Sequence, residues 1–106
     1  MVQAKRRSVA NEKILVVDDG KDNRDFVVEH VLKPNGFVPL TAKDGVECLQ
    51  IVARERPDLI LLDLQMPRMD GLQVLQRLNE HNVNIPVILM TFHGSEEIAI
   101  EGFRMG

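Results

Sequence analysis

Three short apolar runs are the feature that most constrains the fold of this chain. Residues 13–19 (KILVVDD), 58–63 (DLILLD) and 85–91 (IPVILMT) are rich in aliphatic residues, and each ends on a polar side chain. Apolar runs that do not alternate with polar residues are typical of strands covered on both faces, as in a parallel sheet between layers of helices. The chain is therefore expected to build one such sheet.

The segments between these runs have helical patterns. A weaker strand is predicted for residues 37–42, where Pro39 cannot donate a hydrogen bond to a neighbour and so favours a sheet edge. Strands and helices then alternate, which predicts a doubly wound α/β fold of three layers with right-handed crossovers. Asp70 is expected to cap the third helix. The predicted helices cover residues 21–36, 44–57, 71–81 and 95–106.

Composition argues against several classes of protein. The 106 residues carry a net charge of −3, and their one basic cluster lies in a polar leader, residues 1–11, that precedes a single domain at residues 12–106. The single cysteine, Cys48, cannot form an internal disulfide. No apolar run is long enough to span a membrane, and the N-terminus lacks a signal-peptide core. We therefore expect a cytoplasmic domain that binds neither nucleic acid nor membrane directly.

Polar side chains stand where three of the predicted strands end. Asp18 and Asp19 end the first strand, Asp63 ends the third and Thr91 ends the fourth. If the first and third strands are neighbours, three carboxylates converge at one edge of the sheet. Their mutual repulsion favours a bound divalent cation, and Mg²⁺ is the expected ion. Beside such an ion, Asp63 can act as a carboxylate nucleophile that forms an acyl phosphate.

With these residues in place, the chain resembles the receiver domains of two-component response regulators, which have a flavodoxin-like fold. The matching segments, over about residues 12–106, are ILVVDD, DLILLDLQMPRMDG, IPVILMT and SEEIAIEGFRMG. The resemblance implies that Asp63 accepts a phosphoryl group from a histidine kinase or a histidine phosphotransfer protein. It also implies that the domain catalyses its own phosphorylation and dephosphorylation. Thr91 would hydrogen-bond the phosphoryl group, and the surface from Ser95 to Gly106 would change to control an output.

The resemblance also implies a set of metal ligands. Asp19 and Asp63 would bind Mg²⁺ directly, with Mn²⁺ as a substitute, and Asp18 would act mostly through water. The backbone carbonyl of Gln65 would supply a further ligand. Pro67 and Gly71 would shape the loop that follows the nucleophile.

The sequence departs from the family's pattern at its C-terminus. The family has a fifth strand, with a lysine that pairs with the phosphoryl group, and then a fifth helix, whereas this sequence ends at Gly106. No residue is assigned the lysine's role, because Lys21 and Lys43 follow other strands. We therefore expect a fragment of a longer protein, incomplete at the C-terminus. Residues 87–90 would then form an open apolar edge, which favours association.

Phe92 is a second departure, because the family usually has a small residue at this position. Its ring, together with Gln65, is expected to tune the lifetime of the acyl phosphate. The bulky ring and the missing lysine leave a second interpretation open, a receiver-like protein-binding module that does not switch. A nucleotide- or flavin-binding domain is disfavoured, because the first strand is followed by neither a G-x-G-x-x-G motif nor a P-loop. Homodimerisation is compatible with the resemblance, and the output domain or partner is left open.

Overall fold

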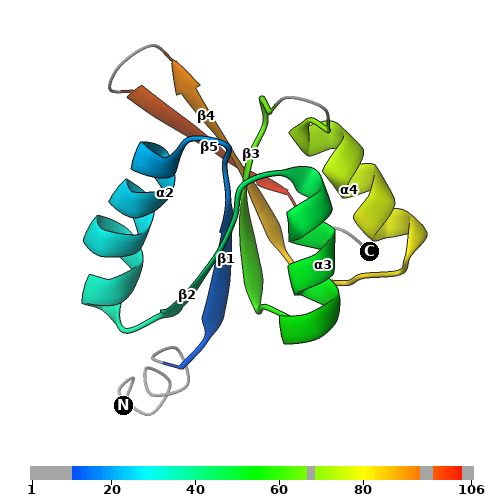
Figure 1. Cartoon of the computed structure of the whole chain (residues 1–106), viewed down its shortest axis with the longest axis horizontal. Coiled ribbons are helices and arrows are strands. Elements are labelled where there is room, and N and C mark those ends of the chain that lie inside the picture. Colours follow the sequence, from blue (N-terminus) through cyan, green and yellow to red (C-terminus); the bar gives the residue numbers. More distant parts are fainter. Residues whose placement is uncertain (1–10, 67–68, 94–96, 104–106) are drawn as a thin grey trace.

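One five-stranded sheet organises the part of the chain that the computed structural model describes. That part is residues 11–66, 69–93 and 97–103. From residue 91 onward, only the backbone is described. The strand order is β2-β1-β3-β4-β5, in which the first four strands are parallel and the last runs antiparallel to its neighbour (Figure 1). The strands are β1 (Lys13–Val17), β2 (Val38–Ala42), β3 (Leu59–Asp63), β4 (Val87–His93) and β5 (Glu97–Phe103).

Helices cover both faces of the sheet. Helix α2 (Lys21–Val27) lies on one face, and α3 (Gly45–Glu55) and α4 (Gly71–Glu80) lie on the other (Figure 1). Helix α2 continues as a π-helical turn, η1 (Val28–Leu32), and a 3₁₀ turn, η2 (Lys33–Asn35). The predicted three-layer α/β architecture is therefore confirmed.

The core forms because the apolar runs of the sequence become the central strands. All residues of β1 after Lys13 are buried, as expected for a strand covered on both faces. The larger apolar cluster lies between the sheet and the α3–α4 layer, and it includes Leu15, Leu62 and Val74. Each fully buried side chain of this kind contributes about 1.5–3 kcal/mol. A smaller cluster under α2 comprises Ile14, Val16, Val27, Leu32 and Met90.

The first edge of the sheet is as predicted. Strand β2 lies outermost, beside β1, and Pro39 pairs in register with Ile14. Because a proline has no N–H to donate, it is tolerated where one side of the strand has no partner. The first and third strands are neighbours, as the convergence of carboxylates required.

The prediction for the C-terminal segment was wrong. Residues 97–103, expected within a helix over 95–106, form β5, which pairs antiparallel along β4 from Val87↔Phe103 to His93↔Glu97. The expected open edge at residues 87–90 is therefore covered. The physical reason is that an apolar edge strand exposes unpaired N–H and C=O groups, which an extended neighbour satisfies. The segment EIAIEGF, with its isoleucines two residues apart, fits a strand as well as a helix.

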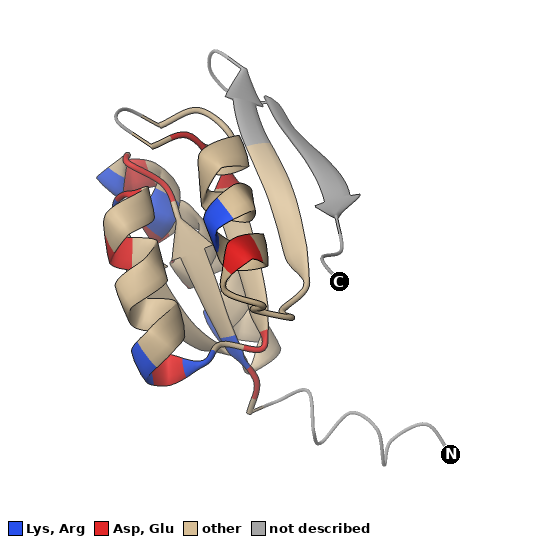
Figure 2. Ribbon diagram, turned by 90° about the vertical axis from the view of Figure 1, so that its right-hand side faces the viewer, with Lys and Arg blue, Asp and Glu red and all other residues tan. Residues whose placement is uncertain are grey.

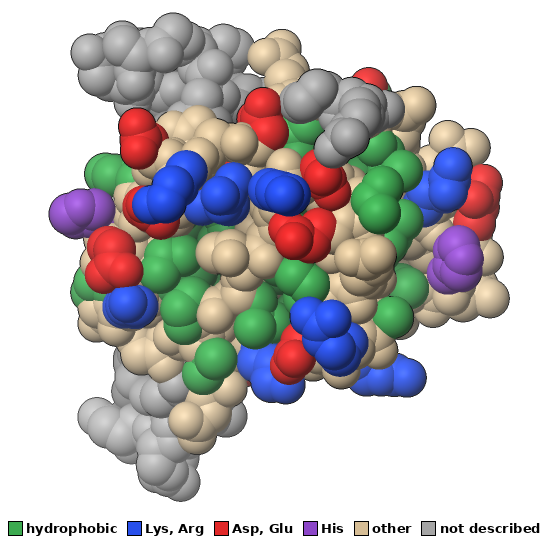
Figure 3. Space-filling model, in the orientation of Figure 1, with side chains coloured by type: hydrophobic (Ala, Val, Ile, Leu, Met, Phe, Trp, Pro, Cys, Tyr) green, Lys and Arg blue, Asp and Glu red, His purple; other side chains and the backbone are tan. Residues whose placement is uncertain are grey.

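The surface carries charges of both signs. On the face shown in Figure 3, Lys and Arg side chains are interspersed with Asp and Glu side chains. Within the described residues, no helix combines the length and the apolar character needed to cross a membrane.

Candidate functional site

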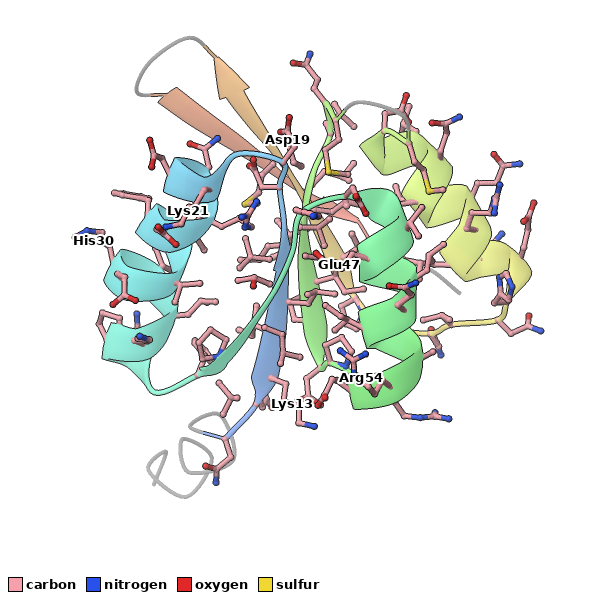
Figure 4. The ribbon with its side chains drawn as sticks, viewed as in Figure 1. Lys13, Asp19, Lys21, His30, Glu47 and Arg54 are labelled. Atoms are coloured by element: carbon pink, nitrogen blue, oxygen red, sulfur yellow. The ribbon has the colours of Figure 1, made fainter. Side chains whose placement is uncertain are left out.

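The three carboxylates come from two adjacent parallel strands. In the register between β1 and β3, Val17 pairs with Leu62, so Asp18 follows one residue beyond this pair, where Asp63 ends β3. Asp19 begins the turn into α2 and lies at the same end of the sheet (Figure 4). Figure 2 shows acidic residues in the loops at this end. Strand topology therefore brings together side chains that are 44 or 45 positions apart in the sequence.

The carboxylates form a compact cluster that is mostly removed from water. One oxygen atom from each of Asp18, Asp19 and Asp63 lies within 4.8 Å of the others. Asp18 is 1% exposed and Asp63 is 5% exposed, whereas Asp19 is exposed. Because the three carboxyl groups are this close and two of them are buried, ionising all three without a cation has a high free-energy cost.

Asp18 is held by its neighbours on one side of its carboxylate. Its Oδ1 accepts hydrogen bonds from the backbone N–H of Gly20 at 2.8 Å and from Nδ2 of Asn23 at 3.5 Å. Its Oδ2 is buried and has no hydrogen-bond partner among the described residues. A buried carboxylate oxygen without a partner is costly, so this atom is suited to a ligand that the cluster would hold.

The pKa of Asp63 is raised to about 6, mainly because the carboxyl group is buried. The negative charges of Asp18 and Asp19 raise it further, while the backbone N–H of Gln65, which donates to Oδ1 at 3.1 Å, lowers it. Burial also raises the pKa of Asp18, against the hydrogen bond from Gly20. A cation bound among these groups would favour their ionised forms, because it replaces the lost hydration.

The loop after Asp63 folds back onto the backbone of the nucleophile candidate. The N–H of Gly71 donates to the carbonyl of Leu64 at 3.0 Å. A Cβ atom at Gly71 would lie 2.7 Å from the carbonyl oxygen of Asp63 and 2.9 Å from Cα of Leu64, so this position needs glycine for its close approach. Asp70 caps α4 in a capping box with Gln73, which confirms its predicted role as a cap.

The remaining predicted site residues are placed less fully. Thr91 and Phe92 belong to β4, where Met90 pairs with Asp63, so Thr91 follows one residue beyond the partner of Asp63. The side chains of Thr91 and Phe92 lie outside the described part, and so do Pro67, Ser95 and residues 104–106. Gln65 is exposed, and its N–H rather than its carbonyl is the group with a recorded contact to Asp63.

Neither lysine considered for the family's lysine role stands at β4 or β5. Lys21 lies in the first turn of α2 and pairs with Asp25 at 2.7 Å, with 75% of its side chain exposed. Lys43 lies between β2 and α3.

Sequence reasoning missed two residues beside the cluster. Asn23 contacts the side chain of Asp18, and Nη1 of Arg24 donates to the backbone carbonyl of Asp18 at 2.8 Å. Both residues lie in α2, where their pattern is that of ordinary polar positions on a helix. No signal in the sequence alone distinguishes them, because the contact depends on how α2 leaves the end of β1.

The donor set fits a hard divalent cation. Carboxylate oxygens are the ligands that Mg²⁺ prefers, and one or two of them with water commonly complete its coordination. The unpartnered Oδ2 of Asp18 and the raised pKa of Asp63 are both features that a cation at this position would relieve. The carboxylates of Asp18, Asp19 and Asp63 therefore have the chemistry and the spacing to hold one such ion.

Comparison with known proteins identifies one family and several relatives. The profile of the response regulator receiver domain matches residues 14–106. Sporulation initiation phosphotransferase F from Bacillus subtilis (strain 168) is 41% identical over 96 residues, which cover 91% of this chain and 77% of that protein. Response regulator MprA from Mycobacterium leprae (strain TN) is 38% identical over 94 residues. That match covers 89% of this chain but 41% of MprA, so this chain spans less than half the length of that relative.

Solved structures show the same fold. The receiver domain of Francisella response regulator 1452 superposes with a TM-score of 0.72 at 35% sequence identity, over 80% of this chain and 69% of that one. The family profile spans most of the chain, and a solved receiver domain shares its fold. The chain belongs to the response regulator receiver domain family.

Proposed function

We propose that this chain is the phosphoacceptor switch of a two-component phosphorelay, with Asp63 as the residue that is phosphorylated. The observation that carries the proposal is the position of Asp63, a buried carboxylate at the end of β3 within 4.8 Å of two others. Receiver domains of response regulators interact with histidine kinases or phosphotransfer proteins, and the relative from Bacillus subtilis is named a phosphotransferase. We infer a donor of the same chemistry here, a phosphorylated histidine.

The reaction moves one phosphoryl group. A carboxylate oxygen of Asp63 attacks phosphorus, the P–N bond to the donor's imidazole breaks, and the electron pair of that bond returns to the ring nitrogen. Hydrolysis later reverses the state, because water attacks phosphorus and releases inorganic phosphate and the free carboxylate. Both steps use groups within this site, so the domain acts on itself.

Mg²⁺, or Mn²⁺ in its place, would neutralise the charge that develops on the phosphoryl oxygens during transfer. Its proposed ligands are the carboxylates of Asp18, Asp19 and Asp63 and the backbone carbonyl of Gln65. The burial of Asp18 and Asp63 supports this assignment, because buried carboxylates are retained where a cation offsets their charge. The Gly20 and Gln65 N–H groups orient two of these carboxylates before any ion binds.

Thr91 is the proposed reporter of phosphorylation. It follows the residue that pairs with Asp63, and a hydroxyl at this point of the sheet can donate to a phosphoryl oxygen. A shift of the β4–β5 end of the sheet would carry the signal to an output. Phe92 and Gln65 are proposed to set the lifetime of the acyl phosphate, because Gln65 lies two residues after Asp63 and Phe92 follows Thr91 in the neighbouring strand β4.

The test is the intact mass of the protein after incubation with acetyl phosphate and Mg²⁺. One added phosphoryl group that is absent in Asp63→Asn and absent in EDTA would support the switch and its nucleophile. A phosphorylated histidine donor is the second arm, since small donors are not used by every receiver. Failure with both donors would refute phosphoacceptance and leave the alternative, a receiver-like binding module.

A further inference from the structure

Two side chains at the start of α2 contact the turn formed by Asp18 and Asp19, which is called the acidic turn below. Asn23 reaches the carboxylate of Asp18, and Arg24 reaches its backbone carbonyl. Neither contact is required to form the helix, whose backbone already closes with the N–H of Arg24 donating to the carbonyl of Gly20 at 3.1 Å. The side-chain contacts therefore serve the turn rather than the helix.

The hydrogen bond from Arg24 to the carbonyl of Asp18 can fix the orientation of the backbone at Asp19. The carbonyl of Asp18 belongs to the peptide group that joins Asp18 to Asp19, so a donor that holds this oxygen restricts the rotation of that peptide plane. Nη1 lies 2.8 Å from the oxygen, and the hydrogen bond is partly buried. Asp19 is the exposed member of the cluster and is not held by any hydrogen bond recorded among the described residues.

Among the described residues, the guanidinium of Arg24 forms no ion pair. The ion pairs recorded for the described residues involve Lys13, Lys21, Lys33 and Arg54, and Arg24 is in none of them. Its side chain is half-buried against the acidic turn rather than extended into solvent. An arginine carries fixed, planar donors, so it holds one carbonyl in a defined direction better than a flexible ammonium group does.

We propose that Arg24 is a positioning residue for the acidic cluster: it holds the Asp18–Asp19 peptide so that both carboxylates face a divalent cation together with Asp63. The inference rests on the proposed metal-dependent function. It goes beyond that function in assigning a part of metal affinity to a residue of α2 that touches neither the ion nor the phosphoryl group.

The positive charge of Arg24 and its positioning role predict opposite changes in Mg²⁺ affinity when the residue is replaced, so the proposal can be tested. Removing a positive charge near three carboxylates would strengthen the binding of a cation if electrostatics dominated. Loss of positioning would weaken it, by roughly tenfold for a residue that orients a metal ligand. The sign of the change in Mg²⁺ affinity therefore separates the two roles of the arginine.

The experiment compares Arg24→Gln and Arg24→Lys with Arg54→Gln in the 106-residue chain. Arg54 is the matched control, because its substitution removes the same charge and its side chain is 66% exposed. It lies at the C-terminal end of α3, far from Asp19 (Figure 4). Mg²⁺ titrations are followed through the amide resonance of Gly20, whose N–H donates to Asp18. The rate of phosphorylation by acetyl phosphate is measured over the same range of Mg²⁺.

The expected result is an apparent Kd for Mg²⁺ about tenfold higher in Arg24→Gln. Arg24→Lys should recover part of the affinity, and Arg54→Gln should match the wild type. Saturating Mg²⁺ should restore most of the phosphorylation rate in Arg24→Gln, which a general loss of structure would not allow. Thermal unfolding in EDTA identifies any variant that fails to fold, and the lysine variant then carries the comparison.

Two results would overturn the inference while the proposed function stands: unchanged or tighter Mg²⁺ binding in Arg24→Gln, or a reduced rate that saturating Mg²⁺ does not restore. A wild-type chain that binds no Mg²⁺ would instead defeat the metal-dependent function itself, and the inference with it.

Discussion

The buried carboxyl group of Asp63 should make the stability of the metal-free protein depend on pH. Burial, and then the charges of Asp18 and Asp19, raises its pKa from 3.8 to about 6. Between these two values the folded chain holds a proton that the unfolded chain has released, so the free energy of unfolding falls as pH rises and levels off above about 6. The full effect corresponds to about 3 kcal/mol.

Asp63→Asn removes this ionisation while it keeps the size of the side chain and an oxygen that can accept from the N–H of Gln65. In EDTA at about pH 7.5, we expect the variant to unfold with a free energy about 2–3 kcal/mol above that of the wild type. The difference should shrink to about 1 kcal/mol near pH 4.5, where the wild-type carboxyl group is mostly protonated in the folded state. Urea denaturation across this range of pH measures it.

Asp22→Asn provides the control, because Asp22 is exposed in the first turn of α2 and its substitution removes the same charge. Its stability relative to the wild type should stay nearly constant with pH. The reasoning is refuted if the advantage of Asp63→Asn does not grow from acid to neutral pH. Mg²⁺ gives a further check, since it should stabilise the wild type but have little effect on Asp63→Asn.

Three other substitutions test the site and its supports. Gly71→Ala places a Cβ atom 2.7 Å from the carbonyl oxygen of Asp63, so we expect a loss of about 1–3 kcal/mol in urea unfolding and slower phosphorylation by intact mass. Asp70→Ala removes the cap of α4 and should cost about 1 kcal/mol in the same unfolding assay, without preventing phosphorylation at saturating Mg²⁺. Phe92→Ala should shorten the lifetime of the phosphorylated protein, followed by mass after removal of the donor; an unchanged or longer lifetime would show that the ring does not protect the acyl phosphate.

Much of this site was predictable because its residues follow buried strands. The apolar runs before Asp18 and Asp63 predict strands, and the rule that parallel strands end at one edge of a sheet predicts that the carboxylates meet. The edge position of β2 was predictable from Pro39 for an equally local reason, since proline lacks the N–H that an inner strand needs. The cap at Asp70 was predictable from residue type and position.

The C-terminal segment shows where such reasoning stops. The residues of EIAIEGF fit a helix and a strand about equally, so local propensity does not choose between them. The choice follows from β4, whose backbone groups are satisfied by an antiparallel partner. The pairing of β5 with β4 is made by backbone groups, which every residue type has, so the residue types of the segment do not predict it.

The sequence by itself therefore determined the element order as far as β4, the parallel arrangement of the first four strands and the three aspartates at their carboxyl ends, because these depend on residue type and on spacing along the chain. The tertiary structure decided the pairing of β5, the burial of Asp63, the close approach of Gly71 and the contact of Arg24 with Asp18. Each of these depends on the distance between atoms that are brought together by packing. Packing distances are set by how whole elements fit against one another, and no short stretch of sequence specifies them.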